Sequence, residues 1–126
     1  SLNTVLNDNE LEKLFPPQKA DHFFDALYGD VSEGAYDIKL AFKGIHSNSI
    51  DLAFELHRRQ GKCLACNLTY GLPEVFKRHP VINIKGIVEQ IDALLDGQAS
   101  CAEWQLGATA EITPELHIIP FTIHLK

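Results

Sequence analysis

Residues 35–70 read AYDIKLAFKGIHSNSIDLAFELHRRQGKCLACNLTY, and this stretch decides the fold. It holds three runs in which apolar and polar residues alternate, separated by short polar turns. The apolar members of the runs are Tyr36/Ile38/Leu40/Phe42, Ile50/Leu52/Phe54/Leu56 and Leu64/Cys66/Leu68/Tyr70. A period of two is typical of strands that bury one face, so the stretch predicts a three-stranded antiparallel meander.

Helical patterns stand on both sides of this meander. Before it, Asn7 is suited to cap a short helix that Pro16-Pro17 would end, and a second helix would run from there to Gly29. After it, a short helix is expected near residues 72–79. A longer helix should begin at the cap residue Asn83, because apolar residues then recur at helical spacing as far as Leu95.

Two more strands are expected at the end of the chain, over residues 101–112 and 116–125, joined by a turn at residues 113–115. The sequence therefore predicts an α+β two-layer sandwich in a single globular domain over residues 1–126. Its order would be helices, three-strand meander, helices and C-terminal hairpin, with about five mostly antiparallel strands and the helices on one face. Pro120 has no N–H for a ladder, so the last strand should lie at an edge or carry a bulge there.

Charge selects between two registers of the first hairpin that keep its apolar faces together. One register places Asp37 opposite Glu55, which is repulsive. The other gives three compatible cross-strand pairs: Lys39–Glu55, Lys43–Asp51 and Asp37–His57. We expect the second register, with a five-residue loop over residues 45–49.

The second hairpin would turn at Arg59-Gln60-Gly61, because a three-residue turn favours a left-handed residue at its third position. This turn places Cys63 opposite His57. Cys63 and Cys66 then point to opposite faces of one strand, with Cys66 in the core. Their C-x-x-C spacing therefore does not predict a zinc or thiol-exchange site.

Asp37, His57 and Cys63 would share one row on the polar face. A carboxylate that orients an imidazole, which in turn deprotonates a thiol, is the general arrangement of an activated nucleophile. A cysteine-dependent enzyme with these three catalytic residues is one hypothesis. Chance neighbours on a solvated sheet face are the alternative.

A second hypothesis concerns anions. Residues 58–85 carry six basic side chains and one acidic side chain, in a chain whose net charge is −6. The candidate anion-binding residues are Lys77, Arg78, Asn83, Lys85 and Gly86, near the start of the long helix. A helix N-terminus attracts anions, although simple helix capping explains the same residues.

Composition narrows the remaining classes. The acidic net charge disfavours nucleic-acid binding, and no apolar run is long enough to span a membrane. Three cysteines without framework spacing, and the lack of a signal-peptide pattern, favour a cytoplasmic protein. We expect no cofactor, because no glycine-rich phosphate loop is present, and no metal, because the six histidines are scattered.

The last strand is apolar on both sides, which a strand with one buried face does not need. Ile119, Phe121, Ile123 and Leu125 form one row, and Leu116, Ile118 and Pro120 begin the other. A second subunit would account for the second row. The sequence therefore favours a small soluble, non-enzymatic binding or adaptor module that forms a homodimer through its C-terminal hairpin. Its ligand would be a protein or a small anion, and the cysteine enzyme and the anion sensor or carrier are the alternatives.

Overall fold

The computed structural model describes residues 5–29, 34–64 and 69–126. The elements follow one another as α2 (Asp8–Leu14), α3 (Gln18–Tyr28), β1 (Tyr36–His46), β2 (Ser49–Arg58), the 3-10 turn η3 (Thr69–Gly71), α4 (Leu72–Arg78), α5 (Ile84–Leu95), β3 (Cys101–Leu106), β4 (Ala110–Thr113) and β5 (Leu116–Leu125). The expected α+β sandwich is confirmed.

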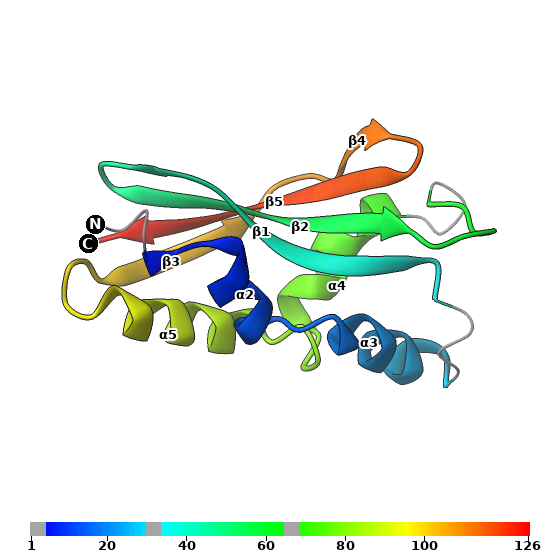
Figure 1. Ribbon diagram of the computed structural model, residues 1–126, viewed down its shortest axis with the longest axis horizontal. Helices are drawn as coiled ribbons and strands as arrows, with labels where there is room; N and C mark the ends of the chain where they lie inside the picture. Colours follow the sequence, from blue (N-terminus) through cyan, green and yellow to red (C-terminus); the bar gives the residue numbers. More distant parts are fainter. Residues whose placement is uncertain (1–4, 30–33, 65–68) are drawn as a thin grey trace.

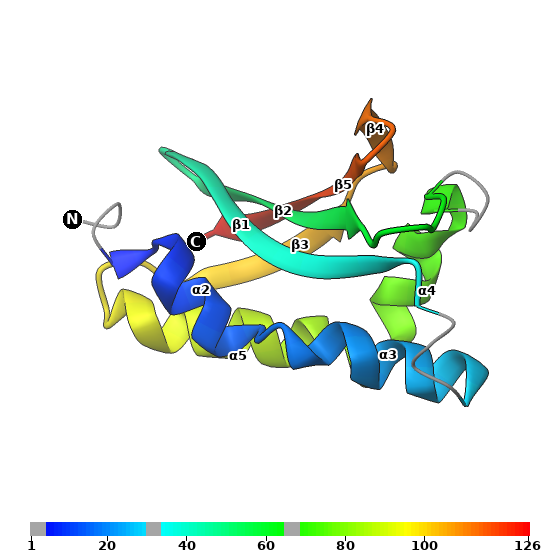
Figure 2. The ribbon, with the colours of Figure 1, turned by 45° about the vertical axis from the view of Figure 1, so that its right-hand side comes forward.

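The strands form one antiparallel sheet in the order β1-β2-β5-β3, and β4 also pairs with β5. The described helices lie along one side of this sheet, and the tip of the β4–β5 hairpin projects away from them (Figures 1 and 2). We call the side that meets the helices the inner face and the opposite side the outer face. None of the described helices crosses the outer face (Figure 2).

The helix ends follow from the residues that the sequence places there. Asn7 caps α2 by accepting a hydrogen bond from the backbone N–H of Glu10 at 2.9 Å. Gly29 ends α3 in the left-handed conformation, with φ of 74°. Asn83 caps α5, and its side chain accepts from the backbone N–H of Gly86 at 3.2 Å. The predicted caps are therefore confirmed.

The core lies between the inner face and the helices, and aromatic rings form its centre. Phe54 of β2 is fully buried and packs against three other rings. Its ring centre lies 5.6 Å from that of Phe15, 5.3 Å from that of Phe76 and 5.5 Å from that of Phe121. These contacts fix the segment after α2, α4 and β5 to the middle of the sheet.

The first hairpin adopts the predicted register from Tyr36 to Phe42, with Lys39 opposite Glu55 and Asp37 opposite His57. The register then shifts between Phe42 and Gly44. Because of this bulge, Gly44 and not Lys43 lies opposite Asp51. The predicted Lys43–Asp51 pair and the five-residue loop were wrong, and the strands are joined by a short turn at residues 47–48.

The third strand of the predicted meander was also placed wrongly. β5 pairs with β2 along residues 49–57, so it occupies the position predicted for that strand. Gly61 does adopt a left-handed conformation, with φ of 77°, but the chain leaves the sheet there. Thr69 to Gly71 form a 3-10 turn. The predicted core position of Cys66 lies outside the described residues.

Pro120 lies in a central strand and not at an edge. Its carbonyl accepts a hydrogen bond from Gly107 N at 2.8 Å, on the side where β3 has ended and β4 has not begun. A strand residue directs its N–H and its C=O to the same side. The missing donor of Pro120 therefore faces the break between β3 and β4, which is why one predicted strand over residues 101–112 is two short ones.

Candidate functional site

β3 forms an edge of the sheet, and part of its backbone faces away from β5. Gln105 and Gly107 bond toward β5, so the N–H and C=O groups of Trp104 and Leu106 point the opposite way. Within the described ranges these outward-facing groups form no hydrogen bond. Trp104 and Leu106 are half-buried, and Gln105 between them is exposed. β3 is therefore an open edge.

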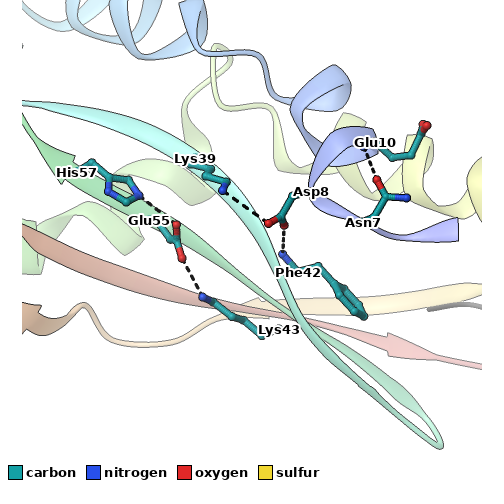
Figure 3. A network of polar contacts seen from close by, with 8 residues as sticks. All are labelled: Asn7, Asp8, Glu10, Lys39, Phe42, Lys43, Glu55 and His57. Carbon is teal, nitrogen blue, oxygen red and sulfur yellow. Dashed lines mark hydrogen bonds and ion pairs between the residues drawn. The ribbon is translucent and has the colours of Figure 1, made fainter. Parts of the chain in front are cut away.

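The edge formed by β1 is closed. Ile38 and Leu40 also direct their backbone groups away from the neighbouring strand, but they are only 2% and 1% exposed. The Asp8 carboxylate of α2 accepts a hydrogen bond from Phe42 N at 3.3 Å (Figure 3). A helix laid over a strand edge prevents pairing with other chains. The sheet is therefore protected along β1 and open along β3.

The outer face is charged over β1 and β2. Lys43 Nζ lies 2.8 Å from Glu55 Oε2, and His57 Nε2 lies 3.0 Å from Glu55 Oε1. Lys39 Nζ lies 3.6 Å from a carboxylate oxygen of Asp8 (Figure 3). Partial burial raises the pKa of Glu55, but the hydrogen bonds with Lys43 and His57 outweigh it and leave this pKa below its ordinary value. The lowered pKa keeps the Glu55 carboxylate negatively charged on the part of the outer face formed by β1 and β2.

The outer face becomes apolar over β5. Leu116, Ile118 and Pro120 are half-buried there, and Ile112 of β4 is 55% exposed. A hollow of about 350 Å³ lies between the two halves. Its lining residues are Lys43, Asp51, Leu52, Ala53, Ile118, Pro120 and Thr122. Such a hollow, apolar with a charged border, has the character of a ligand-binding surface.

The predicted catalytic row is brought together only in part. Asp37 and His57 are cross-strand neighbours, but Arg59 takes the Asp37 carboxylate at 3.1 Å and Glu55 takes the His57 ring. On its other side His57 faces Leu116 of β5, in place of Cys63. Cys63 is exposed in the segment after the Gly61 turn. The three residues do not form the predicted line, and their catalytic role stays a prediction.

The candidate anion-binding residues lie on α4, on α5 and between them. Lys77 is ion-paired with Glu74 at 2.9 Å, and the Asn83 side chain already takes the N–H of Gly86. Lys85 is exposed in the first turn of α5, and Arg78 borders a surface hollow together with Glu74. The backbone N–H of Gly86, in the first turn of α5, is thus already used by the Asn83 cap. Anion binding here stays a prediction.

The basic run over residues 58–85 is partly neutralised by acidic residues from other elements. Arg59 bridges Asp21 at 2.8 Å and Asp37 at 3.1 Å, and Arg58 lies 3.8 Å from Glu115. The distribution of charge over the folded surface is therefore more even than its distribution along the sequence.

A buried polar cluster that the sequence patterns did not predict lies at the base of the β4–β5 hairpin. His117 is fully buried, with Nδ1 2.6 Å from Thr69 Oγ1 and Nε2 3.2 Å from Glu111 Oε1. The Thr109 hydroxyl donates to the Thr69 carbonyl at 2.8 Å. The alternating pattern of β5 indicates that His117 is buried, since it places His117 in the same inner row as Ile119. Thr69 and His117 are both closed to solvent, and the hydrogen bonds of this cluster join η3 to the hairpin.

No match to this chain was found among protein-family models, curated proteins or solved structures. Within residues 5–29, 34–64 and 69–126, no three His, Cys, Asp or Glu side chains gather closely enough to hold a metal ion. No helix in the described part of the chain has the length and apolar character to cross a bilayer. Function must therefore be argued from the open edge and the outer face.

Proposed function

We propose that this chain is a non-enzymatic binding module that self-associates through its C-terminal hairpin, the segment from β3 to β5. The observation that carries the proposal is the open edge of β3. Unpaired backbone groups at an edge are a template for another strand, and natural proteins cover or blunt edges that must stay single. Here α2 covers the β1 edge, whereas the outward N–H and C=O groups of Trp104 and Leu106 form no hydrogen bond with any described residue.

Self-association also accounts for the apolar side chains at the rim of β3. Trp104 and Leu106 are half-buried in the monomer, and each square ångström of apolar surface removed from water contributes about 25 cal/mol. A pair related by a two-fold axis uses the same patch on both copies, so one chain supplies the complete interface. The acidic chain charge opposes pairing only weakly at physiological salt.

Edge pairing leaves the outer faces of both copies uncovered. The joined sheet then presents two hollows, each with an apolar floor at Ala53 and Pro120 and the Lys43–Glu55 ion pair at its border. These hollows are the proposed binding surface for a protein or a small ligand. Chemistry is not needed for this role.

Size-exclusion chromatography with light scattering tests the proposal. The wild-type chain should elute at twice its monomer mass of 14.1 kDa at micromolar concentration, and Leu106→Lys should elute as a monomer. Leu27→Lys is the matched control. Leu27 is 41% exposed on α3, so this variant makes the same chemical change at a site away from the hairpin. A wild-type chain that stays monomeric at every concentration would contradict the proposal.

A further inference from the structure

We infer that β3 pairs antiparallel with β3 of a second copy about a two-fold axis at Trp104, so that the two sheets become one. This inference rests on the self-association proposed above and adds its geometry. In this arrangement a second copy of the chain occupies the open edge, and Trp104 lies opposite Trp104 of that copy.

The backbone makes the pairing feasible. The N–H and C=O groups of Trp104 and Leu106 face outward, and the hydrogen bond from β3 to α5 is made at the first residue of β3, where Asp92 Oδ1 accepts from Cys101 N at 2.8 Å. Cys101–Leu106 contains neither lysine nor proline, two residues that often blunt an edge, and its register shift lies before Trp104, between Cys101 and Trp104. Its one charged residue is Glu103.

Charge and strand length select the register. A two-fold axis at Glu103 would place two carboxylates directly opposite each other, which is unfavourable. An axis at Gln105 would place Glu103 opposite Gly107, beyond the end of β3 at Leu106. An axis at Trp104 places Glu103 opposite Gln105 of the second copy, a pair that can hydrogen-bond, and keeps residues 102–106 opposite one another.

Side-chain size agrees with the same register. Trp104 lies on the inner face, with its ring centre 6.3 Å from that of Phe121 in an edge-to-face arrangement. Trp104 is half-buried at the rim of the sheet, so Trp104 of the second chain can cover the part of the ring that is exposed in the monomer. Leu106 would lie opposite Ala102 of the second copy, a large residue against a small one.

Disulfide trapping between two single variants tests the register. Glu103→Cys and Gln105→Cys are prepared separately, and both replace exposed side chains, so the fold should tolerate them. Residues 103 and 105 of opposite copies would form a non-hydrogen-bonded pair with Cα atoms about 4.5 Å apart, within the range that a disulfide spans. The variants are incubated in a glutathione redox buffer, alone and as a mixture.

The mixture should form a covalent dimer, and each variant alone should remain at the background of the wild-type chain. Crosslinking of Glu103→Cys alone, or of Gln105→Cys alone, would move the axis to that residue and overturn the inference. Light scattering separates the two proposals. A dimer without crosslinking in the mixture would overturn the register and leave the self-association standing, whereas a monomeric wild type would overturn both.

Discussion

Cys101 is the residue whose own chemistry the fold changes most clearly. Its thiol is partly buried at the start of β3, beside Asp92 of α5. Burial, the negative charge of Asp92 and a hydrogen bond to that carboxylate raise the pKa of Cys101 to about 11. All three effects favour the neutral thiol, so Cys101 is a poor nucleophile near neutral pH.

Alkylation of Cys101 should therefore depend on pH in a characteristic way. A pKa of about 11 in place of 9 leaves about a hundredfold less thiolate at pH 8, so iodoacetamide should react correspondingly slowly. The rate should still be rising above pH 9, as followed by mass spectrometry of the peptide that contains Cys101. Asp92→Asn should increase the rate at pH 8, because it removes the negative charge of Asp92 and the hydrogen bond to its carboxylate, both of which raise the pKa of Cys101. A rate that levels off near pH 9 in the wild-type chain would refute this account.

Single residues show how far sequence reasoning reaches. Cross-strand charge correctly placed Asp37 opposite His57, because that pairing depends on neighbouring strands with a short connection. It could not show that Arg59 takes the Asp37 carboxylate, since that contact depends on where the chain turns after β2. His117 had the right spacing for the inner row, but its partners Thr69 and Glu111 come together only in the folded hairpin.

Among the elements, α5 is the one that local sequence specifies most fully. Asn83 adopts a left-handed conformation, with φ of 51°, and its side chain closes the first turn on Gly86 N. A Cβ on Gly86 would collide with the Asn83 side chain, so glycine there leaves room for the cap. The apolar stripe and both ends of this helix could be predicted, because they depend on residues close in sequence.

Two substitutions at Asn83 should separate the contribution of its side-chain hydrogen bond from the cost of its left-handed backbone conformation. Asn83→Ala loses the side-chain hydrogen bond and places in the left-handed region a residue that tolerates it less well than asparagine, so we expect it to lower the free energy of unfolding by about 1–3 kcal/mol. Asn83→Gly keeps the backbone unstrained and should cost only a few tenths of a kcal/mol. Urea denaturation followed by circular dichroism measures both. Equal midpoints for the two variants would contradict the cost assigned to the left-handed conformation, and an Asn83→Ala variant as stable as the wild type would contradict a capping role.

The strands show why the rest of the fold could not be predicted. Alternation shows that a segment can bury one face, but it does not name its neighbour. β5 became the partner of β2 although more than fifty residues separate them, and the run after Gly61 lost that place. The sequence of its own strand predicts an edge or a bulge at Pro120. The break between β3 and β4 that accommodates it belongs to the neighbouring strand.

At the scale of the whole molecule, the two edges of the sheet differ in kind. α2 and Asp8 close the β1 edge, and β3 remains open with apolar residues at its rim. The sequence indicated an unsatisfied apolar surface in the C-terminal hairpin. It did not show which edge was open, because that depends on the final strand order. The charged and apolar halves of the outer face likewise arise only when β2 and β5 lie side by side.

Amide hydrogen exchange of β3 tests self-association through the open edge most directly, because it reports on the backbone groups themselves. Residue-resolved exchange by NMR is measured on dilute and on concentrated wild-type protein. The amides of Trp104 and Leu106 should exchange about tenfold or more slowly in the concentrated sample, since pairing would give them acceptors. Gln105, whose N–H already faces β5, is the internal control and should change little. Exchange at Trp104 and Leu106 that is fast and independent of concentration would contradict the account.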